Sequence, residues 1–377
     1  MVQNIDFGNF EYTPLQDGDD VIYAGQGDDL VYGDNLVADP FVVSVGTRRD
    51  TLYGEEGQDK LFGQERDDQL SGGADKDQLD GGEDSDRVLQ TSDLTQILAD
   101  DNVILNTATL TDGPSTDNLV HIEHATLTGL GVNNLIDASG FSYGSVILQG
   151  GGGDDTLIAT AFGDVLEGGD GNDTLKAGAG NDRLNGGQGS DLVAGGDGAD
   201  LYVFESTTVV EVDTITDTAS PDIDFLDFSA LPASDPVQVV LFGAPGGTTT
   251  NRTLVFTDPQ DFEDIIGGAG DDVIVGNLAD NCILGGTGDD VLRGLDGNDL
   301  LAGTTGDDLL DGGNDNDTYV LTPAWGSADL VIDSGGDDTL NLTRITDDLT
   351  VTLDSGTGLT VTDGTNTLMS WATRSNI

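Results

Sequence analysis

Gly168-Gly-Asp-Gly-Asn-Asp-Thr-Leu-Lys176 is a nonapeptide whose pattern returns three times without interruption. The next units are Ala177-Gly-Ala-Gly-Asn-Asp-Arg-Leu-Asn185, Gly186-Gly-Gln-Gly-Ser-Asp-Leu-Val-Ala194 and Gly195-Gly-Asp-Gly-Ala-Asp-Leu-Tyr-Val203. All four have glycine at positions 2 and 4, aspartate at position 6 and a large apolar residue at position 8. A fixed period over consecutive units indicates one short structural element stacked on copies of itself.

The same pattern occupies three blocks, at about residues 15–88, 150–203 and 267–320, with an insertion in the first at about 35–48. Position 6 is aspartate in every unit except one, where Asn281 replaces it. Low-complexity acidic linkers have no reason to keep a large apolar residue two places after each aspartate. The blocks are therefore predicted to be folded.

The residue types at each position explain what one unit does. Glycines in the first half allow a backbone with positive φ and leave carbonyl oxygens free to point inward. The aspartate adds a hard anionic oxygen, and Ca²⁺ takes about six to eight such oxygens. Positions 7 to 9 are predicted to form a short strand whose central side chain enters the core. Two units would make one coil, and stacked coils would bury a narrow ladder of apolar side chains.

This nonapeptide resembles the RTX, or haemolysin-type, calcium-binding repeat. The resemblance implies an all-β fold, a right-handed parallel β-roll or β-helix solenoid, with multiple Ca²⁺ ions bound between the turns of units i and i+2. Each ion would take carboxylate oxygen from position 6 and carbonyl oxygen from the glycine-rich turns. The candidate ligands carried over from the family are Asp20, Asp29, Asp59, Asp155, Asp173, Asp182, Asp191, Asp200, Asp272, Asp290, Asp299, Asp308 and Asp317, with Gly168, Gly171, Gly186, Gly189, Gly285, Gly288, Gly294 and Gly297.

Some units depart from the pattern. Position 4 holds Arg66, Phe162 or Ala279 in three of them, and sites touching these residues are expected to be weak or absent. Ala279 shares its unit with Asn281, so we expect that turn to be a rung without metal. Asp315 also stands at position 4, where aspartate tolerates a left-handed backbone better than most residues do.

Composition points in the same direction. The chain has 71 acidic and 12 basic residues, a formal net charge of -59, and 56 glycines. Such a charge needs cations to neutralise it in a compact state, and it makes nucleic acid and anionic membranes poor partners. Cys282 is the only cysteine, so no intrachain disulfide can form. No apolar run approaches the length of a transmembrane segment.

The remaining segments are predicted to be rich in strands. Residues 1–14 are interpreted as an N-terminal lead-in or cap, without the basic and apolar regions of a signal peptide. Residues 89–149, 204–266 and 321–377 alternate Thr with Val, Leu and Ile, and we expect them to continue the solenoid without calcium; small bulging β-domains are the alternative. The last segment is interpreted as a C-terminal cap, or as the point where a longer array is cut.

Motifs for catalysis are weak. Gly140-Phe-Ser-Tyr-Gly144 matches a hydrolase nucleophile elbow, but both histidines, His121 and His124, precede the serine, and no helix is predicted after it. In a strand, His121 and Glu123 share one face while His124 points to the other, a poor arrangement for one transition metal. We therefore expect no enzyme activity.

The expected function is that of a calcium-binding extracellular repeat protein that folds on calcium after export. A structural, adhesive or cell-surface role follows, with cell-surface or matrix glycans or proteins as partners. The family resemblance implies type I secretion machinery and an uncleaved C-terminal signal, which residues 321–377 could hold. Two alternatives remain: the non-catalytic RTX portion of a secreted protease, lipase or polysaccharide-modifying enzyme, and an enzyme whose site lies in a segment between the blocks.

Overall fold

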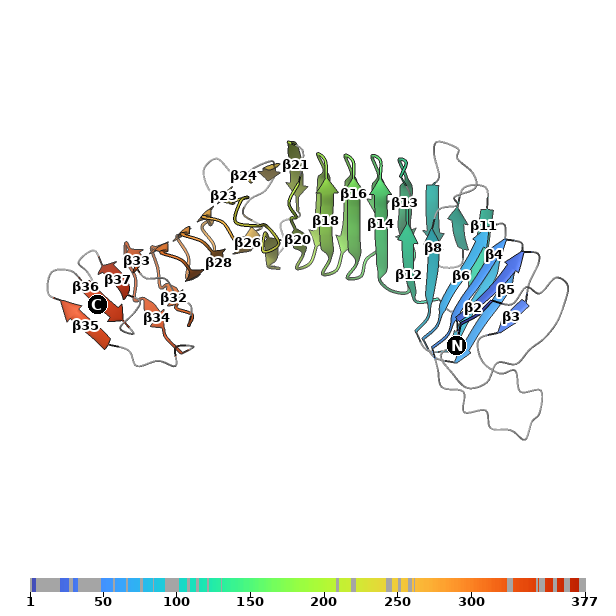
Figure 1. Cartoon of the computed structure of the whole chain (residues 1–377), viewed down its shortest axis with the longest axis horizontal. Coiled ribbons are helices and arrows are strands. Elements are labelled where there is room, and N and C mark those ends of the chain that lie inside the picture. Colours follow the sequence, from blue (N-terminus) through green and yellow to red (C-terminus); the bar gives the residue numbers. More distant parts are fainter. Residues whose placement is uncertain are drawn as a thin grey trace, which may run out of the picture. The chain divides into compact units, whose positions relative to one another are not determined.

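The computed structural model is all-β in the part of the chain that it describes. The described residues are 2–4, 21–26, 30–32, 49–56, 58–65, 67–74, 77–83, 85–91, 102–106, 109–112, 115–120, 122–129, 131–207, 210–217, 222–241, 246–249, 252–256, 260, 262–323, 328–343, 345, 350–354, 358–362 and 367–372. Every regular element among them is a strand (Figure 1). The chain divides into two compact units, Met1–Asp182 and Arg183–Ile377.

The first unit is a stack of parallel strands that alternate between two sheets. On one sheet Leu52 pairs with Leu70, and Leu148 pairs with Leu166. On the other, Leu157 pairs with Leu175. The strands are β1 (Val2–Asn4), β2 (Val21–Gln26), β3 (Leu30–Tyr32), β4 (Thr51–Glu56), β5 (Lys60–Glu65), β6 (Gln69–Ala74), β7 (Gln78–Glu83), β8 (Arg87–Thr91), β9 (Asn102–Asn106), β10 (Thr109–Asp112), β11 (Ser115–Val120), β12 (His124–Thr128), β13 (Leu135–Gly140), β14 (Val146–Gly152), β15 (Thr156–Ile158), β16 (Val165–Asp170) and β17 (Thr174–Ala179).

The second unit repeats this arrangement. Its parallel pairs again join every second strand, so that Ile283 lies opposite Leu301 on one sheet and Leu292 opposite Leu310 on the other. The strands are β18 (Arg183–Gln188), β19 (Leu192–Asp197), β20 (Leu201–Val203), β21 (Glu211–Thr216), β22 (Asp224–Asp227), β23 (Gln238–Val240), β24 (Gly246–Thr248), β25 (Arg252–Phe256), β26 (Phe262–Ile266), β27 (Val273–Val275), β28 (Cys282–Thr287), β29 (Val291–Leu295), β30 (Leu300–Thr305), β31 (Leu309–Gly313), β32 (Thr318–Val320), β33 (Ala328–Asp333), β34 (Thr339–Asn341), β35 (Thr350–Asp354), β36 (Gly358–Thr362) and β37 (Thr367–Ala372).

The apolar residue at position 8 forms the core of both units. Leu157, Leu175, Ile274, Leu292 and Leu310 are at most 1% exposed. Each lies in register with its counterpart one coil away, because successive coils are parallel and carry the same residue at the same height. The prediction of a parallel β-solenoid with a ladder of apolar side chains is therefore confirmed.

The strand-rich segments combine the two forms considered for them. In the first unit, β11 pairs in parallel with β7, and β9 with β13, while β9, β10 and β11 form an antiparallel sheet. In the second unit, β21 and β27 flank the antiparallel set β25, β24 and β23 in the same way. The third segment follows the same order from β33 to β37, β36 and β35. Each segment therefore continues the stack and also inserts an antiparallel sheet into it.

Candidate metal sites in the repeat turns

The position-6 aspartates lie in the turns, and the structure buries them. Asp155 is 1% exposed, and its own backbone N–H donates to Oδ1 of Asp173, one coil further, at 2.7 Å. In the second unit the N–H of Asp290 donates to Oδ1 of Asp308 at 2.9 Å, and that of Asp299 to Oδ1 of Asp317 at 2.9 Å. One carboxylate oxygen of each repeat is thus used to tie neighbouring turns together.

The second carboxylate oxygen has a different environment. Within the described part of the chain, Oδ2 of Asp155, Asp290, Asp299, Asp308 and Asp317 is buried and accepts no hydrogen bond. A buried charge without a compensating partner is costly, and proteins meet that cost with a counter-charge or a metal ion. Each of these turns therefore offers an anionic oxygen that requires a cation.

Backbone carbonyl oxygens gather at the same points. A Cβ placed on Gly294 would collide with Oδ2 of Asp299 and would lie 2.8 Å from the carbonyl oxygen of Gly312 on the next turn. A Cβ on Gly150 would likewise meet Oδ2 of Asp155 and the carbonyl oxygen of Gly168. Carboxylate and carbonyl oxygens therefore converge beside the glycine at position 1. This set of hard oxygen donors from two adjacent turns fits Ca²⁺.

The pKa values of these carboxyls reflect their burial. Burial raises the pKa of Asp290 to about 8 and that of Asp317 to about 7, although a backbone hydrogen bond opposes the rise in each case. Burial also raises the pKa of Asp155, Asp299 and Asp308 to about 6. A bound cation would favour the ionised form and lower these pKa values again.

Comparison with known families agrees with this geometry. The model of the RTX calcium-binding nonapeptide repeat, which describes four copies, matches residues 16–35, 42–65, 53–88, 142–166, 149–184, 167–202, 261–292 and 293–320. The chain belongs to the RTX calcium-binding repeat proteins. RTX repeats bind Ca²⁺ at multiple sites, and the acidic turns described above are consistent with that property. No curated protein is detectably similar to the chain. No helix that could cross a bilayer occurs among the described residues.

In three RTX turns of the described chain, the side-chain oxygen at position 6 instead accepts a hydrogen bond from an N–H of its own turn. Oδ2 of Asp164 accepts hydrogen bonds from N–H and Oγ1 of Thr160, at 2.8 and 2.7 Å. Oδ2 of Asp272 accepts from the N–H of Gly268 at 2.7 Å, and Oδ1 of Asn281 from the N–H of Asn277 at 3.0 Å. We call these three turns capped, and the turns of Asp155, Asp290, Asp299, Asp308 and Asp317 open. In a capped turn the N–H of position 2 satisfies the oxygen that an ion would otherwise use.

The capped turns include two of the three units in which the sequence predicted damage, and the third contains Arg66, which lies outside the described residues. Phe162 lies in the turn closed by Thr160, and Ala279 lies in the turn closed by Asn277. In the latter, the amide of Asn281 donates to Oδ1 of Asn277 at 3.1 Å and to the carbonyl of Glu263 at 3.2 Å. An amide network replaces the anionic oxygens there. The cap at Asp272 has no such signal, since its repeat, from Gly267 to Val275, follows the pattern.

In the second unit an arginine side chain supplies the positive charge to two further buried carboxylates. Arg252 is 3% exposed, and its Nε lies 2.6 Å from Oε1 of Glu211 and 2.7 Å from Oδ2 of Asp213. Its guanidinium also donates to the carbonyl of Gly187, at position 2 of a repeat turn. Asp213 continues the ladder, because its Oδ1 accepts the N–H of Asp191 at 3.0 Å. Arg252 thus supplies positive charge to carboxylate and carbonyl oxygens of two adjacent turns.

Non-glycine residues in left-handed backbone are a second feature that the repeat pattern did not reveal. Leu295 and Thr304 stand at position 2 with φ of 101° and 84°, and Asp315 at position 4 has φ of 71°. The tolerance expected of Asp315 is confirmed. Leucine and threonine adopt such angles at a cost on the order of 1–2 kcal/mol. The stacked turns on either side impose the conformation.

Of the other predicted ligands, Asp59, Asp173, Asp182, Asp191 and Asp200 are at most 2% exposed, as are the repeat aspartates discussed above. Asp20, Asp29 and Arg66 lie outside the described residues. The predicted glycine ligands stand in the turns themselves; four of them, Gly171, Gly189, Gly288 and Gly297, have positive φ. The other four, Gly168, Gly186, Gly285 and Gly294, occupy position 1.

The weak catalytic motif has the wrong context. Residues Gly140–Gly144 connect β13 to β14, so the sequence forms strand, loop and strand, whereas a nucleophile elbow joins a strand to a helix. Nδ1 of His124 lies 3.1 Å from Oγ of Ser145, and His121 is outside the described residues. Ser145 directly precedes β14, so it gives His124 a polar contact next to that strand.

Proposed function

We propose that this RTX protein is extracellular, folds when it meets calcium after export, and serves as a structural, adhesive or cell-surface component. The observation that carries the proposal is the set of buried carboxylates of Asp155, Asp290, Asp299, Asp308 and Asp317, whose Oδ2 accepts no hydrogen bond among the described residues. Without cations these oxygens oppose folding, and with cations they become bonds between turns. Calcium concentration would then decide whether the chain is folded.

The charge of the chain supports the same switch. With a net charge of -59, an extended chain reduces its own repulsion at low calcium. An unfolded chain has no preformed site, so the free energy of ion binding becomes free energy of folding. Sites suited to extracellular calcium bind with Kd on the order of 10⁻⁴–10⁻³ M. Many ions along one stack make the transition cooperative.

The ions would be held by the open turns. Asp290 and Asp308 would contribute carboxylate oxygen on one side of the second unit, and Asp299 and Asp317 on the other. Bound Ca²⁺ would neutralise these carboxylates and cross-link adjacent coils. Since Oδ1 already accepts a backbone N–H of the neighbouring turn, the ion would add a second link between the same two turns.

Export and scaffolding form the second part of the proposal. Type I secretion machinery, guided by a C-terminal signal within residues 321–377, would carry the unfolded chain out of the cell. Cell-surface or matrix glycans or proteins would be the partners of the folded solenoid. The chain would act by binding and scaffolding, without catalysis. The alternative is the non-catalytic part of a secreted enzyme, which the complete gene product would reveal by a catalytic domain.

The test is far-ultraviolet circular dichroism during a calcium titration of the metal-free chain, with magnesium as the control. We expect β-structure to appear cooperatively near millimolar calcium and not with magnesium, which keeps its waters and demands octahedral geometry. Full β-structure in chelator at neutral pH and low salt, or an equal response to magnesium, would refute the switch.

A further inference from the structure

The last repeat of the third block has tyrosine at position 8, where most repeats have an aliphatic residue. Tyr319 occupies position 8, and its hydroxyl accepts the N–H of Gly312 at 2.9 Å. The same hydroxyl donates to Oδ2 of Asp333 at 2.7 Å. Asp333 ends β33, in the strand-rich segment after the block. Tyr319 therefore holds a carboxylate of that segment against the last repeat turn.

Three carboxylates meet at this point. Asp317, Asp333 and Asp338 each offer an oxygen, and the three oxygens lie within 4.8 Å of one another. Asp317 is 1% exposed, and its Oδ2 accepts no hydrogen bond among the described residues. A Cβ on Gly312 would meet both this Oδ2 and the hydroxyl of Tyr319, so the oxygen lies beside the group that holds Asp333. A buried anionic oxygen thus faces two further carboxylates.

The segment from Asp333 to Asp338 has the form of one more repeat turn. Gly336, at position 4, has φ of 140°, and a Cβ there would collide with the carbonyl oxygen of Asp315 and lie 2.7 Å from Oδ1 of Asp338. Asp338, at position 6, accepts the N–H of Asp317 on its Oδ1 at 3.1 Å. Two positions differ: Asp333 replaces glycine at position 1, and Ser334 replaces it at position 2. This turn therefore carries one carboxylate more than an ordinary repeat.

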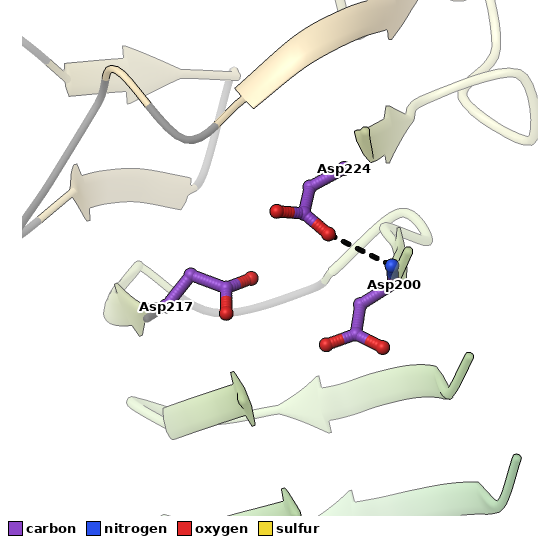
Figure 2. A group of neighbouring side chains, drawn as sticks. All are labelled: Asp200, Asp217 and Asp224. Carbon is purple, nitrogen blue, oxygen red and sulfur yellow. Dashed lines mark hydrogen bonds between the residues drawn. The ribbon is translucent and has the colours of Figure 1, made fainter. Parts of the chain in front are cut away.

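The second block ends in the same way. Asp200, Asp217 and Asp224 also place one oxygen each within 4.8 Å of one another, and Figure 2 shows the three carboxylates facing a common space. Tyr202 stands at position 8, accepts the N–H of Gly195 at 2.9 Å and donates to Oδ2 of Asp217 at 2.6 Å. The N–H of Asp200 donates to Oδ1 of Asp224 at 2.8 Å. Two block ends that differ in sequence thus build one arrangement.

We propose that each cluster binds one calcium ion, which joins the last repeat turn of the block to the strand-rich segment after it. The inference rests on the proposed calcium-dependent folding and adds a class of site that the nonapeptide does not contain. Three carboxylates form a hard oxygen set with the flexibility that Ca²⁺ accepts, and the carbonyl oxygens of Thr216 and Ile332 each lie 3.3 Å from the hydroxyl of the tyrosine at their cluster. Tyr202 and Tyr319 are positioning residues, because they orient Asp217 and Asp333. The ion would end each row of open turns.

The experiment removes one carboxylate from each cluster. Asp224→Asn and Asp338→Asn keep an Oδ1 that can accept the N–H of the last repeat aspartate, so the backbone link survives. The matched control is Asp337→Asn, which makes the same charge change at the exposed neighbour of Asp338. Calcium-45 equilibrium dialysis counts ions per chain, and circular dichroism at saturating calcium checks the fold.

We expect the double variant to lose two ions near millimolar calcium, through affinity at those sites lower by about 10–100-fold, and the control to lose none. An unchanged count in a double variant made from a calcium-binding wild type would overturn the two sites and leave the proposed function standing. A wild type that binds no calcium would overturn both. If the double variant does not fold, the single variant Asp338→Asn, at an exposed residue, decides the question by the loss or retention of one ion.

Discussion

Arg252 gives the sharpest test of how this fold satisfies its buried carboxylates. The substitution Arg252→Met removes the charge and keeps most of the side-chain volume. Its Nε lies 2.6 Å from Glu211 and 2.7 Å from Asp213, whose side chains are 1% and 4% exposed. Both carboxylates would stay buried and lose their counter-charge, keeping the backbone hydrogen bonds from Gly189 and Asp191. Breaking such a buried pair from one side costs about 3–5 kcal/mol.

A surface ion pair in the same unit provides the control. Nε of Arg293 lies 3.9 Å from Oδ2 of Asp311, and these side chains are 51% and 29% exposed. Solvent screens such a pair, so Arg293→Met should cost at most about 1 kcal/mol. The two variants make the same chemical change, and they differ in the burial of the partners.

The loss in Arg252→Met should also depend on pH. Burial raises the pKa of Asp213 to about 7, and the charge of Arg252 opposes that rise. Without the arginine the folded-state pKa rises further above the unfolded value. The penalty is then fully present above the folded pKa and disappears as pH falls through it, because the folded state takes up the proton. Destabilisation should be large at pH 8 and smaller at pH 5.

The assay is urea unfolding in saturating calcium, followed by circular dichroism at both pH values. At pH 8 we expect the midpoint of Arg252→Met to fall by about 1–2 M urea, while Arg293→Met changes it little. If the two variants unfold within about 1 kcal/mol of each other at pH 8, or if the loss does not shrink at pH 5, the guanidinium is not the counter-charge of this turn.

Three more predictions follow from the turns. Asp290→Asn should weaken calcium binding at its site by about 10–100-fold in titration calorimetry. Asp272→Asn should leave the number of bound ions unchanged, because the N–H of Gly268 caps that carboxylate. Equal effects of the two substitutions would contradict the distinction between open and capped turns. Gly169→Ala should cost about 1–3 kcal/mol in chemical unfolding, since φ there is 110° and the new Cβ would strike a backbone carbonyl. The control Gly152→Ala, whose Cβ would meet no atom closer than 3.6 Å, should change stability by less than about 0.5 kcal/mol. A similar cost for both variants would argue against backbone strain. In chelator, β-structure followed by circular dichroism should increase from pH 8 to pH 5. Burial raises the pKa of several repeat aspartates to between about 6 and about 8, so the folded state binds more protons over this range than the unfolded state does. A loss of β-structure on acidification over this range would contradict the prediction.

Much of the fold was predictable because each repeat specifies its own conformation. The apolar residue at position 8, for example Leu292, needed only a parallel neighbour at the same height, and an equivalent residue 18 positions along supplies it in Leu310. The aspartate at position 6 was predicted as a ligand because it recurs at the same position of the repeat. Phe162 and Asn281 marked two of the three capped turns, because the damage is local to the repeat.

Other features depend on residues that are close only in the folded chain. Asp272 belongs to a repeat that follows the pattern, yet its turn packs beside the strand-rich segment, where the N–H of Val237 donates to its Oδ1 and a Cβ on Gly270 would contact Pro236. On that side the neighbouring turn comes from the strand-rich segment and not from a repeat, and the N–H of Gly268 caps the carboxylate.

By itself, the sequence determined the strands, their parallel stacking, the buried apolar ladder and the aspartates that line the turns, because these depend on a nine-residue pattern and its nearest copies. Only the tertiary structure decided that the turn of Asp272 is capped, that Arg252 forms an ion pair with Glu211, and that carboxylates from the strand-rich segments lie beside the block ends at Asp200 and Asp317. The reason is that the charge state of a buried oxygen depends on every group around it, and the inserted segments bring those groups from distant positions in the chain.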